Sequence, residues 1–200
     1  MSTNNVWIPM QEVESAYGTR EVSLRTRLYG ERVIIIDGEI TSETLDSVAM
    51  QAMMLAKSDE PVRLLINSGG GQVQAGLGIY DILQDLQKTR VVDYYCYGLA
   101  ASMAAVIFSG GKKGHRFLLP HSEMMIHEPL IQNGLGGSAS SISRTAESIL
   151  GTKKLLNEIL AEHTGKTVDE INVAIEHDNY MKADEAIKFG LADEVRGLLA

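Results

Sequence analysis

Two residues in the stretch from Tyr97 to Pro129 could together perform acyl-transfer chemistry, Ser102 and His127. A serine hydroxyl becomes an effective nucleophile only when a base accepts its proton, and that base needs a third group to fix its tautomer. Ser102 follows the small residues 98–101 and precedes an apolar run, 103–108. This pattern predicts a strand, a tight turn and a buried helix with Ser102 in its first turn.

The start of a helix would suit a nucleophile, because its unpaired N–H groups can stabilise an oxyanion, with the Met103 N–H as the nearest candidate. Serine is also a favoured N-cap residue, a role that needs no chemistry. His127 ends a predicted strand, Met124-Met125-Ile126, and could reach a neighbouring turn. Its alternative role is that of a half-buried histidine with a backbone partner. Only the pair, taken together, indicates catalysis.

The rest of the chain predicts alternating strands and helices that would position these two residues. Hydrophobic patterns predict strands at 33–36, 62–66 and 91–97, and helices at 42–57, 73–87 and 142–163. The strand at 62–66 runs into Asn67-Ser68-Gly69-Gly70-Gly71, where glycines allow backbone N–H groups to approach an anion. No nucleotide-binding glycine motif is present. The alternation predicts a mixed α/β domain with a largely parallel sheet.

Composition restricts the class of protein. The 200 residues suffice for one domain with a sizeable core. A net charge of -8 and the lack of Lys/Arg runs argue against nucleic-acid binding. No apolar stretch has membrane-spanning length and no signal sequence is visible, so we expect a cytoplasmic protein without a membrane segment. The single cysteine, Cys96, is expected to be a small core residue, and residues 1–20 are expected to be irregular.

Two long motifs resemble those of a known family. Gly98-Leu99-Ala100-Ala101-Ser102-Met103-Ala104-Ala105 and Leu119-Pro120-His121-Ser122-Glu123-Met124-Met125-Ile126-His127-Glu128-Pro129 are similar to the serine and histidine motifs of the proteolytic subunit of the ATP-dependent Clp protease. The similarity covers nearly the whole chain. It implies a crotonase-like ββα superhelix, with an N-terminal axial segment at 1–20 and a single domain at 21–200. Residues from about 131 to 163 would form a projecting strand-helix handle that interdigitates with a second ring.

The resemblance also completes the active site. Sequence alone leaves the third catalytic group open among Glu176, Asp178, Asp184 and Glu185, since any carboxylate that folds beside His127 would serve. The stretch Glu176-His177-Asp178-Asn179-Tyr180 matches the family pattern at Asp178. By the same resemblance, the N–H groups of Gly71 and Met103 would form the oxyanion hole, and no metal or cofactor is needed.

The chain departs from the family at Gly69, where the family has proline, so we expect a looser glycine loop. Arg63 stands where the family often has tyrosine, in the hydrophobic pocket that receives a hexameric AAA+ unfoldase. We therefore expect weaker docking. The other pocket positions are Leu65, Tyr95, Tyr97, Phe117 and Leu119.

The family stacks two heptameric rings, with an arginine before the catalytic aspartate paired across the ring-to-ring contact. This chain has His177 there, beside Glu176. Because histidine has a reference pKa near ~6.5 and arginine stays charged, we expect ring stacking to weaken between roughly pH 6 and pH 8.

Together with the Ser102–His127 pair, the resemblance implies a serine endopeptidase that hydrolyses unfolded polypeptides inside a closed barrel fed by an ATP-dependent unfoldase. Three alternatives remain open: a crotonase-type acyl-CoA enzyme on the same fold, a non-catalytic ring paralogue, and a relative that needs no unfoldase. The rings could also contain a paralogue of this chain.

Overall fold

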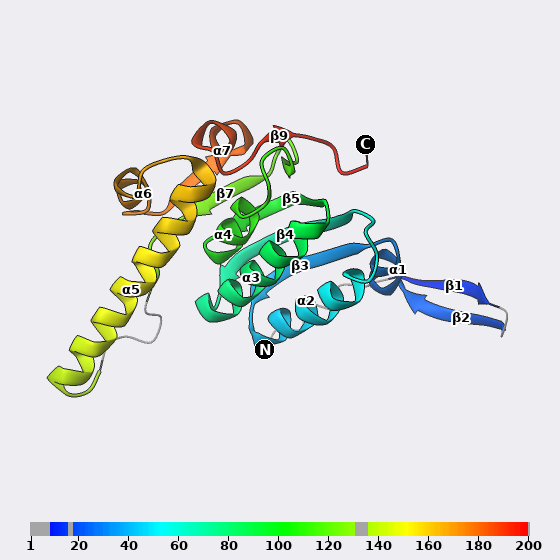
Figure 1. The fold of residues 1–200 in the computed structure, drawn as a ribbon, viewed down its shortest axis with the longest axis horizontal. Coiled ribbons are helices and arrows are strands. Elements are labelled where there is room, and N and C mark those ends of the chain that lie inside the picture. Colours follow the sequence, from blue (N-terminus) through cyan, green and yellow to red (C-terminus); the bar gives the residue numbers. More distant parts are fainter. Residues whose placement is uncertain (1–8, 16–17, 131–135, 200) are drawn as a thin grey trace.

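The computed structural model describes residues 9–15, 18–130 and 136–199, and its core is a parallel sheet covered by helices (Figure 1). The central path runs in the order β3-β4-β5-β6-β9, with every neighbouring pair parallel. These strands are β3 (Val33–Ile40), β4 (Val62–Gly71), β5 (Val92–Ala101), β6 (Arg116–Leu118) and β9 (Glu194–Val195). The predicted α/β fold class is confirmed, and it is the class that the family resemblance implies.

Two further strands branch from β5 and carry part of the site. β7 (Glu123–Ile126) pairs in parallel with the last residues of β5, whereas β6 pairs with its middle. β8 (Asn179–Lys182) pairs antiparallel with β7. The carboxyl ends of β5 and β7 therefore lie at the same edge of the sheet.

The helices α2 (Ser42–Leu55), α3 (Val73–Thr89) and α4 (Met103–Ser109) pack on one face of the sheet (Figure 1). Val62, Leu64 and Ile66 of β4 are fully buried in this core, whereas the alternate residue Arg63 is exposed. Because side chains alternate across a strand, one face of the sheet packs on helices and the other is more open. The remaining helices are α1 (Leu24–Gly30), α5 (Ala139–Thr164), α6 (Val168–Ala174) and α7 (Ala183–Phe189).

Three strands are longer than predicted. β3 continues through Asp37 and Gly38, β4 continues through the glycine tract to Gly71, and β5 continues to Ala101. The expected glycine loop and small-residue turn are therefore largely strand. Gly38 has φ 74° and lies at a register shift between β3 and β4, so a bulge rather than a turn accommodates it.

The N-terminal residues correct the expectation of an irregular segment at 1–20. β1 (Met10–Ser15) and β2 (Gly18–Ser23) form an antiparallel hairpin that extends away from the sheet (Figure 1), and the boundary at residue 20 falls inside β2. Both strands are mostly polar. Their ladder bonds to each other stabilise them without a core, so hydrophobic patterning gave no signal.

Helix α5 projects from the domain (Figure 1), with only Leu156, Asn157 and Leu160 buried near its C-terminal end. Ser138 caps its start, so it begins three residues before the predicted position. The strand expected in the handle, before the predicted helix start at residue 142, is not found at 136–141, where the chain is irregular and then helical, and residues 131–135 lie outside the described residues. Within the described ranges, no helix is both long and apolar enough to cross a membrane.

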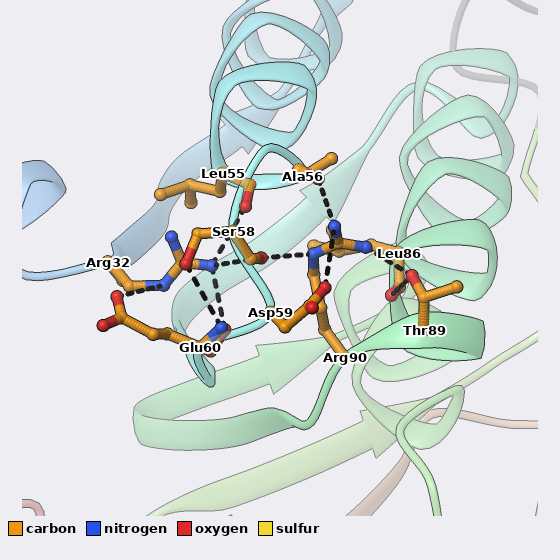
Figure 2. A network of polar contacts seen from close by, with 9 residues as sticks. All are labelled: Arg32, Leu55, Ala56, Ser58, Asp59, Glu60, Leu86, Thr89 and Arg90. Atoms are coloured by element: carbon orange, nitrogen blue, oxygen red, sulfur yellow. Dashed lines mark hydrogen bonds and ion pairs between the residues drawn. The ribbon is translucent and has the colours of Figure 1, made fainter.

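Two arginines fasten the segment that connects α2 to β4 (Figure 2). Arg32 donates to the carbonyl oxygens of Leu55 at 3.0 Å and Glu60 at 2.8 Å. Arg90 donates to Ser58 O at 2.7 Å and also to Ala56 O. Leu55 and Ala56 lie at the C-terminal end of α2, where carbonyl oxygens lack intrahelical partners, so the two guanidinium groups supply donors to them.

Candidate active site

Ser102 alone forms the turn between β5 and α4. Its backbone has φ 55° and ψ -126°, a conformation that non-glycine residues rarely adopt. Its N–H donates to Met125 O at 2.8 Å, which fastens the turn to β7. Ser102 stands at the N-cap position, but its side chain makes no capping hydrogen bond. The hydroxyl is therefore free for another partner.

That partner is His127, whose Nε2 lies 2.8 Å from Ser102 Oγ. The register of the strands explains this contact. Ala101 of β5 pairs with Met125 of β7, and Ser102 and His127 come just after the ends of these two parallel strands. His127 is largely buried, with 14% of its side chain exposed. The arrangement places a base within hydrogen-bond reach of a serine hydroxyl, as general-base activation requires.

Asp178 lies on the other side of the imidazole. Its Oδ1 is 3.4 Å from His127 Nδ1, and 61% of its side chain is exposed. Asn179, the next residue, pairs with Ile126 in the antiparallel β8–β7 ladder, which brings Asp178 beside His127. The structure thus brings Ser102, His127 and Asp178 together.

The other candidate acids lie elsewhere. Glu185 accepts the Lys182 N–H at 2.8 Å and Asp184 lies in the first turn of α7, so both belong to the start of that helix. Glu176 and His177 are exposed, between α6 and Asp178.

The predicted oxyanion donors lie on two sides of the turn at Ser102. Met103 is the first residue of α4. Gly71 pairs with Ile40 of β3, and the next N–H, that of Gln72, donates to Ile40 O at 2.8 Å.

Gly70 has a steric role that the sequence analysis missed. A Cβ built on it would lie 2.7 Å from Ser102 Cβ, 2.7 Å from Ala101 O and 3.1 Å from Met103 N. Its φ is 94°, which also favours glycine. Only glycine lets β4 approach the turn this closely. The signal was present in the three successive glycines, but we assigned them only donor roles.

A small cavity adjoins Ser102 and His127. It is mostly apolar, and its lining residues are Val73, Ser102, Met103, Val106, Ile126, His127, Pro129, Leu156, Asn157 and Leu160. Asn157 is 1% exposed and donates to Asn172 Oδ1 at 2.6 Å, while its own Oδ1 has no partner in the described part of the protein. The cavity places apolar side chains next to Ser102. Sequence reasoning missed this contribution of α5, although Leu156 and Leu160 have the spacing of one helix face.

Three of the residues expected to receive an unfoldase share one face of the sheet, but Tyr95 and Phe117 are only 6% and 2% exposed. Leu65, Tyr95 and Phe117 are register neighbours on β4, β5 and β6. The rings of Tyr95 and Phe117 have centroids 5.0 Å apart, and the Arg196 guanidinium lies 3.8 Å from the centroid of Phe117. Arg196, which sequence reasoning missed, therefore covers part of this face. The other two positions, Tyr97 and Leu119, are half-buried.

Cys96 is fully buried, and burial raises the pKa of its thiol, so it is a core residue. Among the described residues, no group of three or more His, Cys, Asp or Glu side chains is arranged to hold a metal ion.

A family model described as Clp protease matches residues 16–197. The match includes the turn at Ser102, the segment that carries His127 and the loop that carries Asp178. It therefore covers every side chain brought together at this site.

Proposed function

Because this chain belongs to the Clp protease family, a family of peptidases, we propose that Ser102, His127 and Asp178 form its catalytic triad. The observation that carries the proposal is the 2.8 Å contact between Ser102 Oγ and His127 Nε2, made at a strained turn that leaves the hydroxyl uncapped. The reaction is hydrolysis of a peptide bond through an acyl-enzyme.

In this mechanism, Ser102 Oγ attacks the peptide carbonyl carbon while His127 Nε2 accepts the hydroxyl proton. Asp178 orients the imidazole through Nδ1 and stabilises its charged form. His127 then donates the proton to the leaving amine, and the C–N bond breaks. A water molecule, activated by the same histidine, hydrolyses the ester and regenerates Ser102.

The negative oxygen of each tetrahedral intermediate would be held by the N–H groups of Gly71 and Met103. Donors that are fixed before reaction are the most effective, because they need no reorganisation as charge develops. The apolar cavity beside Ser102 would hold the substrate side chain that precedes the cleaved bond. The 3.4 Å separation of Asp178 and His127 is of the kind that tightens when substrate binds.

A fluorophosphonate probe tests the assignment directly. We expect one adduct, on Ser102, and loss of both labelling and peptide hydrolysis in Ser102→Ala. Full activity of the alanine variant would refute the triad.

We further propose that the chain assembles into two stacked heptameric rings that enclose the active sites, with α5 as the handle between rings. Ile142 and Leu150 on the projecting part of α5 are 38% and 63% exposed, which suits burial against a second copy. Native mass spectrometry should give fourteen subunits, and a monomer at micromolar concentration would contradict it.

His177→Arg should remove any loosening of the rings between about pH 6 and pH 8.

The open face of the sheet would receive the unfoldase. Arg63 is exposed two residues before Leu65 on this face, so we expect Arg63→Tyr to increase unfoldase-driven degradation. Unchanged degradation by Arg63→Tyr would count against this docking site. If an unfoldase does not stimulate degradation by the wild-type protein, the alternative of a relative that needs no unfoldase is favoured. The contact between Ser102 and His127 disfavours both a non-catalytic paralogue and a crotonase-type acyl-CoA enzyme, neither of which requires this pair.

A further inference from the structure

Strand β4 loses its regular hydrogen-bonded register on both sides just before the glycine tract. On the β3 side, the register shifts between Asp37 and Glu39, and on the β5 side it shifts between Ile66 and Ser68. Such irregularities leave backbone groups without ladder partners. At this point, the side chains of Asn67 and Ser68 make the connections to the neighbouring strands.

Asn67 connects β4 to β5. Its Oδ1 accepts the Leu99 N–H at 3.0 Å, three residues before Ser102. A Cβ built on Gly98 would lie 2.5 Å from this same oxygen, so glycine at position 98 makes room for the bond. The amide therefore holds the final residues of β5 at a fixed distance from β4.

Ser68 connects β4 to β3 and to the glycine tract. Its hydroxyl donates to Gly38 O at 2.5 Å and accepts the Gly70 N–H at 3.1 Å. The side chain is 2% exposed, so water does not replace these bonds. One hydroxyl thus joins the bulge of β3 to Gly70, where an added Cβ would lie 2.7 Å from Ser102 Cβ.

We propose that Asn67 and Ser68 are positioning residues for the oxyanion hole, an inference that rests on the proposed function. Gly69, Gly70 and Gly71 belong to the residue type with the greatest backbone freedom. An oxyanion donor must lie about 2.7–3.1 Å from the developing charge. The Asn67 and Ser68 side chains supply the restraint that the three glycines do not.

Removal of the Ser68 hydroxyl should therefore act on the transition state. We expect Ser68→Ala to lower kcat by about 10- to 100-fold, less than loss of a whole donor, with KM nearly unchanged. A peptide boronic acid, which forms a tetrahedral adduct on serine, should lose affinity by a similar factor. Asn67→Ala should act in the same direction, and Ser68→Thr, which keeps the hydroxyl, should recover most of kcat.

Ser122→Ala is a matched control. Ser122 is also 2% exposed, and its hydroxyl donates to Cys96 O at 2.7 Å, so the variant loses a comparable buried bond in the same sheet away from the glycine tract. We expect a similar fall in Tm with unchanged kcat.

Three results would overturn the inference: equal kcat losses in Ser68→Ala and Ser122→Ala, an effect confined to KM, or unchanged boronate affinity. An active Ser102→Ala variant would instead refute the proposed function. The two failures are therefore distinguishable.

Discussion

Gly70 lies so close to Ser102 that a Cβ on it would be 2.7 Å from the serine Cβ. We expect Gly70→Ala to abolish peptide hydrolysis and to lower Tm, because the new methyl group must displace the turn and the φ of 94° is strained for alanine. Gly69→Ala is the adjacent control, since a Cβ there meets nothing within 4 Å. Peptidase assays and thermal unfolding of both variants test this, and normal turnover by Gly70→Ala would show that the close approach is not needed.

Asp178→Asn should lower kcat by roughly 10³- to 10⁴-fold, because the imidazolium loses its anionic partner and the histidine its preferred tautomer. Asp184→Asn, an exposed acid in the first turn of α7, should have no effect. Steady-state kinetics of the two variants decide between Asp178 and a different third group. Wild-type turnover by Asp178→Asn would exclude Asp178 from the triad.

Arg90 should contribute to stability through the carbonyls it satisfies. Arg90→Ala leaves Ser58 O and Ala56 O without this partner, so we expect a loss of about 1–3 kcal/mol in the free energy of unfolding. Lys88→Ala serves for comparison, because its ion pair with Asp85 is exposed and should contribute less than about 1 kcal/mol. Urea unfolding measures both. Equal losses of unfolding free energy in the two variants would show that the carbonyl contacts of Arg90 stabilise the protein no more than an exposed ion pair does.

The buried pair of Arg116 and Asp193 should be sensitive to removal of one partner. Arg116 is 2% exposed, and its Nη2 lies 2.5 Å from Asp193 Oδ1. Arg116→Met removes the cation from a partly buried carboxylate, which keeps only the N–H groups of Gly114 and residue 116, and this should cost about 3–5 kcal/mol. The double variant Arg116→Met/Asp193→Leu should recover in urea unfolding the part of that loss that is due to the carboxylate, but not the part due to the carbonyl oxygens of Ser109, His163 and Gly190, to which Arg116 also donates. A double variant as unstable as the single one would contradict this explanation.

The same pair gives a pH dependence. Burial alone would raise the pKa of Asp193, but the hydrogen bonds and charge of Arg116, with the Gly114 N–H, outweigh it and lower the pKa. The stabilisation is therefore complete above the ordinary carboxyl pKa of about 4 and is lost as pH falls through the lowered value. Urea unfolding between about pH 5 and pH 2 should show a shallower decline for the double variant, and parallel curves would refute the linkage.

Sequence patterns predicted the elements that bury a continuous or periodic apolar face. The strands through Ile34 and Leu64 and the helix through Val48 are such elements, because their local residues alone determine which face is buried. The resemblance of the two motifs to a known family predicted that Ser102 and His127 lie in contact. The spacing of the two residues in the sequence did not decide whether they do.

What escaped prediction depends on contacts between distant segments. Gly70 and Ser102 are far apart in the chain, so no local pattern reports that a Cβ on Gly70 would meet Ser102. Arg196 covers Phe117 from the far end of the sequence, and Asn157 enters the cavity from a helix that otherwise projects from the domain. Hydrophobic periodicity reports burial, but it does not report which segments meet.

The positive φ of Ser102 also limits which residues could replace it in the proposed role of nucleophile. A threonine hydroxyl has comparable reactivity and serves as a nucleophile in other hydrolases. At φ 55°, however, its branched Cβ would clash with the backbone, whereas cysteine adds no branch. Cysteine could therefore replace Ser102 at this turn. Threonine could not, because the conformation of the main chain excludes its branched Cβ, even if the surrounding side chains could accommodate it.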